Sequence, residues 1–480
     1  MDVDRAQIAR IVEDVVRRYA GGTGSPPAAP SAGPRPVGTQ RGVFATLDDA
    51  AAAARESQKR WMALPLEKRA ECVQAMRNVA LENARAMADR AHAETGLGRA
   101  DDKYRKNLVA IQKTPGVEDL KPTVYTGDHG LTLMELAPYG VIGSVTPTTN
   151  PVATVINNSI SMVSAGNGVV FNPHPRAKGC CNHMIALLNG AIHQAGGPET
   201  LLTSLVEPSQ ATSQALMQHR GIDCLVVTGG PHVVREAMKS GKKCIAAGPG
   251  NPPVVVDETA DLAQAARDTV AGASFDNNIM CTCEKEAFIV DRVFREFVER
   301  VVAQGCYLLT PHQFDELTRV IFAPPPVGKT RPVLNSSLVG QYASDIAKTI
   351  GLDLPRETRL LVAEAPPDHP LVMQEQLMPV LPLVRVRDVE EAMARAVEAE
   401  GGRFHTALMH SRNIDSLSRM AKLSNCNIFV KNGPCYAGLG FGGEGHTTMT
   451  IAGSTGEGIT SARTFTRQRR CVLVDHFRIL

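Results

Sequence analysis

The chain has 480 residues, of which 43% are hydrophobic and 21% charged, and this composition excludes a wholly disordered chain or a small disulfide scaffold. Its 51 Lys and Arg residues nearly balance 49 Asp and Glu residues, and the net charge of +2 argues against nucleic acid as a main partner. The length suggests two to four domains of roughly 100–200 residues each.

No segment has the pattern of a signal peptide or a membrane span. The first twenty residues carry charges every few positions. The longest stretch without Asp, Glu, Lys or Arg, 136–175, contains Pro138, Pro147 and Pro151, so we expect a buried strand–helix–strand unit there rather than a spanning helix. The eleven cysteines are scattered without the spacing of a zinc site, which predicts a protein of the reducing cytosol that binds no metal.

The first forty residues have a pattern of their own. Residues 1–20 predict an amphipathic helix with one apolar stripe, made by Ile8, Ile11, Val12, Val15, Val16 and Tyr19. Half of the residues in 21–42 are Gly or Pro, which is typical of a flexible linker. A helix on such a tether either folds back on its own domain or docks on another protein.

A globular α/β pattern begins at residue 43. Residues 47–113 have helical patterns, and residues 122–139 alternate like a hairpin. From residue 140 strands and helices alternate, which favours parallel sheets covered by helices. The expected strands are 140–145, 169–171, 225–227, 254–256, 287–290, 360–364, 405–409 and 428–430. The segment 469–475 also has a strand pattern and could pair with another subunit.

Polar motifs follow several of these strands, at the position where open α/β sheets bind ligands. They are VTPTTNP (145–151), FNPHP (171–175) and VTGGP (227–231). The amide of Asn150 can donate to an oxyanion, although the same residue could simply cap the following helix. Gly229 and Gly230 would let a ligand approach the backbone. Cys281 lies in a polar loop and is either a nucleophile or an inert buried thiol.

Together these motifs resemble the aldehyde dehydrogenase superfamily, and within it the coenzyme A-acylating branch of bacterial microcompartments. The similarity covers essentially the whole chain. It rests on ETGLGR (94–99), NNSISMVSAGN (157–167), VVTGG (226–230), AAGPGNPPVVVDETADL (246–262), SFDNN (274–278) before Cys281, EKE (284–286), EQLMPVLP (375–382) and FVKNGP (429–434). The propionaldehyde type of propanediol utilisation is the most similar in character, and the acetaldehyde type comes next.

The resemblance implies an aldehyde dehydrogenase-like α/β fold with two parallel-sheet domains and a small β oligomerisation element. The implied NAD- and CoA-binding domain comprises 43–121 and 140–257, and the catalytic thiol domain is 258–435. Strands in 122–139 and 460–480 would join subunits into a homodimer or homotetramer. The amphipathic helix 1–20 would bind a microcompartment shell protein, which places the enzyme in the lumen of a cytoplasmic microcompartment.

The resemblance also implies the roles of individual residues. Cys281 is the expected nucleophile, and Asn150 with the Cys281 amide is the expected oxyanion hole. Glu375 would hold the nicotinamide ribose, and Gly229 and Gly230 would lie near the pyrophosphate. The full set of expected cofactor-binding residues is Thr146, Pro147, Thr148, Asn172, His174, Pro175, Gly229, Gly230, Val233, Glu375 and Leu377.

The absence of one acidic residue indicates which molecule accepts the acyl group. Hydrolytic relatives carry a Glu that activates water in the segment corresponding to 244–256, and that segment has no acidic residue here. Water without a positioned base is a poor nucleophile, whereas a thiol is a good one, so coenzyme A is the expected acceptor. We therefore expect NAD-dependent oxidation of a short-chain aldehyde, with propionaldehyde favoured, to its acyl-CoA. The alternatives are acetaldehyde as the main substrate, a hydrolytic aldehyde dehydrogenase, or a non-catalytic docking protein.

Overall fold

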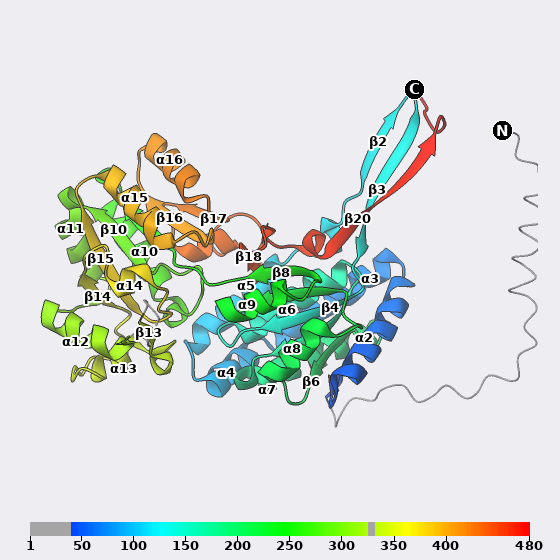
Figure 1. The fold of residues 1–480 in the computed structure, drawn as a ribbon, viewed down its shortest axis with the longest axis horizontal. Helices are drawn as coiled ribbons and strands as arrows, with labels where there is room; N and C mark the ends of the chain where they lie inside the picture. The colour runs from blue at the N-terminus through cyan, green and yellow to red at the C-terminus, as the bar shows by residue number, and fades with distance from the viewer. Residues whose placement is uncertain (1–39, 325–331) are drawn as a thin grey trace, which may run out of the picture. The chain divides into compact units, whose positions relative to one another are not determined.

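The computed structural model describes residues 40–324 and 332–480, and every structural statement below concerns those residues. The predicted helix 1–20 and almost all of the predicted linker 21–42 lie outside them. Figure 1 shows two layered α/β parts, each built on its own sheet, and an arm of three strands that extends away from both. Within the described ranges, no helix has the length and apolar character needed to cross a bilayer.

The first sheet has six parallel strands in the order β1-β6-β5-β4-β7-β8. Its strands are β1 (Val43–Phe44), β4 (Val141–Thr146), β5 (Gly168–Pro173), β6 (Leu202–Leu205), β7 (Cys224–Thr228) and β8 (Lys243–Ala247). Its helices are α2 (Leu47–Met62), α3 (Leu66–Glu82), α4 (Ala84–Thr95), α5 (Ala100–Lys113), α6 (Pro151–Ser164), α7 (Lys178–Gln194), α8 (Gln210–Gln218) and α9 (Pro231–Met238). The strand order reverses beside β4, and such a switch point is where open α/β sheets bind ligands.

Neighbouring residues of β4 and β7 pack in two separate hydrophobic cores, one on each face of this sheet. Ile142 and Val226 pack in the core that contains α6 and α7, whereas Val141 and Leu225 pack in the core that contains α2 and α8. This alternation follows from the two-residue period of a strand. The charge-free stretch predicted to be a buried strand–helix–strand unit forms β4, α6 and β5, and every residue of α6 is buried. Burial on both faces explains the absence of charge.

The second sheet has seven parallel strands in the order β11-β14-β15-β10-β9-β16-β17. They are β9 (Pro253–Val256), β10 (Glu286–Val290), β11 (Tyr307–Leu308), β14 (Leu361–Glu364), β15 (Val380–Val386), β16 (Thr406–His410) and β17 (Ile428–Lys431). The helices with this sheet are α10 (Leu262–Ala273), α11 (Asp291–Val302), α12 (Pro311–Ile321), α13 (Ala343–Lys348), α14 (Pro370–Met373), α15 (Val389–Glu400) and α16 (Ile414–Ser424).

The chain changes sheets between β8 and β9, a few residues before the boundary at 257 that the sequence analysis set. The run at β9 is short and apolar and would suit either sheet, but its partners β10 and β16 come later in the chain. The remaining short elements are the antiparallel pairs β12 (Phe322–Ala323) with β13 (Val333–Leu334) and β18 (Ile451–Ala452) with β19 (Gly458–Ile459), and the 3₁₀ turns η1 (Val117–Asp119), η2 (Pro175–Ala177), η3 (Phe275–Asn278), η4 (Ser336–Leu338), η5 (Cys435–Leu439) and η6 (Ala462–Phe465).

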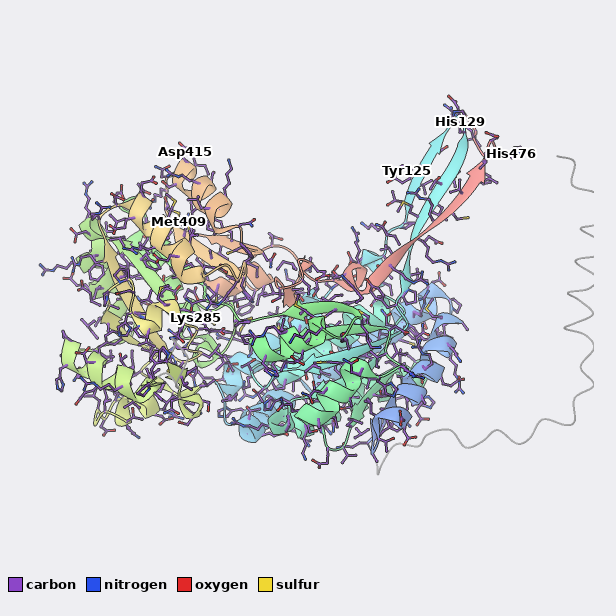
Figure 2. The ribbon with its side chains drawn as sticks, in the orientation of Figure 1. Tyr125, His129, Lys285, Met409, Asp415 and His476 are labelled. Carbon is purple, nitrogen blue, oxygen red and sulfur yellow. The ribbon has the colours of Figure 1, made fainter. Side chains whose placement is uncertain are left out.

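The arm is an antiparallel sheet in the order β2-β3-β20, formed by β2 (Thr123–Gly127), β3 (Gly130–Pro138) and β20 (Thr466–Val474). The predicted hairpin and the predicted late strand are both present, and β20 pairs with β3 of its own chain. Figure 2 shows Tyr125 on the arm and His129 and His476 at its tip. Val124, Val472 and Val474 of the arm are each more than half exposed. A subunit contact through this arm remains a prediction.

Candidate active site

One pocket of about 560 Å³ lies at the carboxyl ends of β4, β5, β7 and β8 and extends to the loops of the second sheet. All thirteen residues expected to serve catalysis or cofactor binding line it, although they come from five separate stretches of the chain. They are Thr146, Pro147, Thr148, Asn150, Asn172, His174, Pro175, Gly229, Gly230, Val233, Cys281, Glu375 and Leu377. The structure therefore brings together every side chain and glycine that the motifs singled out.

The pocket also contains residues that the sequence analysis did not name. Ser209, Gln210 and Ser213 come from the start of α8, a helix that was not predicted. The available signal was a capping box, because the Ser209 side chain accepts from the backbone of Thr212 and the Thr212 hydroxyl accepts from Ser209 N. Thr212 also donates from its hydroxyl to Asn172 Oδ1 at 2.7 Å. Asn172 is therefore held by α8, and its side chain is almost fully buried.

The loop before Cys281 has an unusual backbone. Asp276, Asn277 and Asn278 all lie in the left-handed region, with φ angles of 47°, 53° and 63°. Asp and Asn tolerate this region better than other residues with side chains, but each such residue costs on the order of 1–3 kcal/mol. Surrounding hydrogen bonds hold the turn: Asn277 Nδ2 donates to Gly340 O at 3.0 Å, and Asn278 Nδ2 donates to Ala273 O at 2.7 Å.

A buried lysine fixes the other side of the same loop. Lys285, labelled in Figure 2, is fully buried, and its Nζ donates to Asn278 O at 2.8 Å and to Met280 O at 3.1 Å. Of the two neighbouring thiols, only Cys281 lines the pocket. Cys283 is fully buried, and its sulfur lies 3.7 Å from Phe275 O. The geometry thus separates a pocket thiol from a core thiol.

The environment of Cys281 keeps its thiol protonated at neutral pH. Burial and, to a smaller extent, the negative charge of Glu375 together raise the pKa of Cys281 to about 12, against the opposing effect of Lys285. Burial also raises the pKa of the Glu375 carboxyl. Because the thiolate is the reactive form, Cys281 needs help from a bound ligand or a nearby base before it can attack.

Alkylation of Cys281 by iodoacetamide should therefore be slow at pH 7 and rise about tenfold per pH unit up to pH ~10, since each unit multiplies the thiolate fraction by ten below the pKa. The measurement is a timed series of alkylations read by mass spectrometry of the peptide that carries Cys281. Exposed Cys471 in the same sample is the internal control. Glu375→Gln should speed Cys281 alkylation at a given pH, and a rate plateau below pH 9 would contradict the raised pKa.

Asn150 occupies the N-cap position of α6, yet its side chain makes no capping hydrogen bond to that helix. Its Oδ1 instead accepts from Lys106 Nζ at 2.5 Å, and its Nδ2 donates to Thr149 Oγ1 at 3.3 Å. A simple capping role, the alternative considered for this residue, is therefore absent. An amide has two N–H groups, so the second can donate to a carbonyl oxygen bound beside Cys281.

The glycine turn after β7 fits a dinucleotide. Gly229 and Gly230 precede α9, whose N-terminal N–H groups and dipole favour a phosphate. A Cβ added at Gly230 would meet no atom within 4 Å, and one added at Gly229 would meet only Val233 at 3.8 Å. The space above the turn is open, and the lining residue Glu375 lies across the same pocket. These residues could hold the pyrophosphate and ribose of a nicotinamide cofactor.

The segment that lacks an acidic residue runs directly behind Cys281. A Cβ added at Gly250 would lie 2.5 Å from Cys281 O, so no larger side chain fits that position without a shift of the backbone. Gly248 and Pro249 line the pocket, and Glu375 is its one acidic lining residue among the described positions. At Gly250, the close packing of the backbone on the loop that carries Cys281 thus leaves no room for a carboxylate side chain.

Several known proteins are similar to this chain over most of its length. A model described as the aldehyde dehydrogenase family matches residues 28–320. An acetylating acetaldehyde dehydrogenase of Salmonella typhimurium is 53% identical over 442 residues, which span 92% of this chain and 94% of that protein. A CoA-propanoylating propanal dehydrogenase of the same organism is 46% identical over 440 residues, which span 92% of this chain and 93% of that protein.

Solved structures share the fold over nearly the full length. A propionaldehyde dehydrogenase from the Clostridium phytofermentans fucose utilisation microcompartment has a TM-score of 0.89 and 42% identity and covers 92% of this chain and 100% of that one. A Rhodopseudomonas palustris propionaldehyde dehydrogenase with bound CoA and an acylated cysteine has a TM-score of 0.87 and 44% identity. The match covers 90% of this chain and 98% of that one. An engineered glycolyl-CoA reductase with bound NADP⁺ has a TM-score of 0.88 and 44% identity. The match covers 92% of this chain and 99% of that one.

These matches confirm the predicted aldehyde dehydrogenase fold with two parallel sheets and small antiparallel sheets. They also correct one preference, because the acetaldehyde enzyme is more similar in sequence than the propanal enzyme that the sequence analysis favoured. The chain belongs to the aldehyde dehydrogenase family, in its coenzyme A-acylating branch of the microcompartment type.

Proposed function

We propose that acetaldehyde is the main substrate of this CoA-acylating aldehyde dehydrogenase, that NAD is its cofactor and that acetyl-CoA is its product. The observation that carries the proposal is a second, small cavity whose lining includes Met280, which precedes Cys281 in the chain, and Lys106, which is hydrogen-bonded to Asn150. Its volume is about 10 Å³, and it is lined by Arg105, Lys106, Val109, Phe275, Met280, Tyr436, Leu439, Phe441 and Met449. A volume of that order admits about one water molecule, so only a small alkyl group would fit without movement of the walls.

Aromatic rings form the rigid side of this cavity. The ring centroids of Phe275 and Tyr436 lie 5.2 Å apart, as do those of Tyr436 and Phe441. Mutually packed rings resist displacement because each ring contacts both of the others. The sequence identity of 53% to an acetaldehyde enzyme, against 46% to a propanal enzyme, supports the same substrate. Propionaldehyde, the substrate favoured by the motifs, is the second candidate.

In the proposed mechanism, the thiol proton of Cys281 passes to solvent, and the sulfur attacks the aldehyde carbon to form a tetrahedral thiohemiacetal anion. The amide of Asn150 and the backbone N–H of Cys281 would hold the negative oxygen. A nicotinamide cofactor held by Gly229, Gly230 and Glu375 would supply the acceptor for the hydride of the former aldehyde carbon, and loss of that hydride would leave Cys281 as a thioester. The thiol of CoA then attacks the thioester carbon, the Cys281 sulfur leaves with the electron pair, and acyl-CoA departs.

The test compares kcat/KM for acetaldehyde, propionaldehyde and butyraldehyde at saturating NAD and CoA. We expect acetaldehyde to exceed propionaldehyde and butyraldehyde to be poorest. One methylene is worth about 1–3 kcal/mol in such a pocket, so differences of roughly tenfold or more per carbon are expected. Phe441→Ala should widen the cavity and thereby reduce the difference in kcat/KM between acetaldehyde and the longer aldehydes. A native enzyme that prefers propionaldehyde would reverse the assignment while leaving the reaction class intact.

We also propose that residues 1–20 bind a microcompartment shell protein and that the arm of β2, β3 and β20 joins subunits into a homodimer or homotetramer. The six-residue apolar stripe of 1–20 supports the first proposal, and the exposed valines of the arm support the second. A reporter that carries residues 1–42 should sediment with purified shells and lose this association when Ile11 and Val15 are both changed to Asp. If the double-Asp reporter sedimented with shells as well as the unchanged reporter, the apolar stripe would not be the surface that binds the shell.

A further inference from the structure

The amide of Asn150 is oriented by a residue that the motifs did not single out. Lys106, on α5, is 4% exposed, and its Nζ lies 2.5 Å from Asn150 Oδ1. An ammonium group has three N–H donors and no acceptor, so the amide atom that faces it must be the oxygen. The Nδ2 group of Asn150 must then face the other way, where Thr149 Oγ1 lies at 3.3 Å and the pocket opens.

Lys106 is also tied to the loop that carries Cys281. Its Nζ forms an ion pair with the carboxylate of Asp276, which is fully buried in the left-handed turn. Asp276 is itself fixed, because Oδ1 accepts from Arg99 N at 2.6 Å and Oδ2 lies 3.2 Å from Lys103 Nζ. One ammonium group thus connects the turn before the nucleophile with the amide that would hold the oxyanion.

We propose that Lys106 is a positioning residue of the acyl-transfer site. It fixes which face of the Asn150 amide points into the pocket, and its ion pair with Asp276 anchors the ammonium group that does so. A cation hydrogen-bonded to the amide oxygen also polarises the N–H bonds, which strengthens them as donors. This inference rests on the proposed function in one respect, namely that Cys281 is the nucleophile and Asn150 an oxyanion donor.

The test uses an activated ester, so it requires neither aldehyde nor NAD nor CoA. p-Nitrophenyl acetate acylates Cys281: the sulfur bonds to the acetyl carbon, p-nitrophenolate leaves with the electron pair of the broken bond, and the thiol proton passes to solvent. The rate constant of the stoichiometric p-nitrophenolate burst reports attack at the oxyanion hole. Cys281→Ala is the blank.

We expect Lys106→Met to lower the burst rate constant about 100-fold with little change in half-saturation by the ester, since loss of one oxyanion donor costs about 10²–10³ in rate. Lys103→Met is the matched control. Both lysines pair with Asp276, but in the described part of the chain Lys106 is hydrogen-bonded to Asn150 and Lys103 is not, so the Lys103 variant should stay within about threefold of wild type. The double variant Lys106→Met/Asn150→Ala should react no more slowly than Asn150→Ala alone.

Equal losses in the Lys106 and Lys103 variants would overturn the proposal, because the effect would then belong to the Asp276 turn. Multiplicative losses in the double variant would overturn it as well, because Lys106 would then act independently of Asn150. Thermal unfolding identifies a misfolded Lys106→Met protein, in which case Lys106→Gln carries the test with an expected loss of about tenfold, since a Gln amide can face Asn150 either way.

The outcome separates this inference from the proposed function. If the wild-type protein showed a burst but no CoA-dependent NADH formation, the aldehyde chemistry would be refuted. The burst rate constants of the Lys106 and Lys103 variants would still test the positioning role. A wild-type protein with no burst at all would refute both. A Lys106→Gln protein that is folded and as fast as wild type would refute the positioning role alone.

Discussion

Replacement of Cys281 by alanine should abolish CoA-dependent NADH formation, with a loss of at least about 10⁴-fold, because removal of a covalent nucleophile from an enzyme costs up to about 10⁶ in kcat. Cys283→Ala should keep most of the activity. Both follow from position, since Cys281 lines the pocket and Cys283 is fully buried beneath it. The measurement is the initial rate of NADH formation with acetaldehyde, NAD and CoA.

Thermal unfolding provides the control for this pair. Cys283 packs in a core with Phe275 and Cys435, so its alanine variant should lose some stability, on the order of 1–2 kcal/mol for a small buried side chain. Cys281→Ala should unfold close to the wild-type temperature. If Cys283→Ala were inactive and folded while Cys281→Ala retained activity, the nucleophile would have to be reassigned.

Omission of CoA should have the second large effect. With acetaldehyde and NAD alone, the enzyme should form about one NADH per active site and then slow by several orders of magnitude. The reason is that the acylated Cys281 would have to be released by water, and the backbone at 248–250 that lies against it carries no carboxylate. Stopped-flow absorbance at 340 nm separates the burst from the later steady rate.

Addition of CoA after the burst should restore turnover at once, which shows that the stalled enzyme is an intermediate and not an inactivated protein. Glu375 is the acidic residue that could replace the missing base, because it lines the same pocket. Rapid steady release of acetate that disappears in Glu375→Gln would therefore contradict the acylating mechanism and identify Glu375 as a base for water.

Much of the fold could be predicted because its strands are short apolar runs at regular spacing. The runs that became β4, β5 and β7 were all anticipated, and so was the hairpin at β2 and β3. β15 was not anticipated, because Pro382 lies inside it and proline is rare in central strands. β15 forms because it pairs with β10 and β14, and the local sequence does not indicate that pairing.

The residues that line the pocket could be predicted where a motif contains them, as at Asn150, Gly229 and Cys281. Lys106 could not, because the run DDKYRKN (101–107) has the composition of an exposed helix face. Lys106 is buried beside Asp276, 170 residues away in the chain, which supplies its charge partner. Charge alone predicts exposure, and only the folded chain shows which charges are neutralised inside.

The pairing of β3 with β20 has a consequence for biosynthesis. Nine residue pairs join the two strands, from Thr466 with Pro138 to Val474 with Gly130, and about 330 residues separate the first pair along the chain. A ribosome that adds roughly 5–20 residues per second needs about 15–65 s to cover that interval. Both parallel sheets are complete in the nascent chain before β20 exists, and throughout that time β3 has one unpaired edge. Neighbouring nascent chains on one messenger would present this edge to each other, so the arm offers a site for premature association during translation.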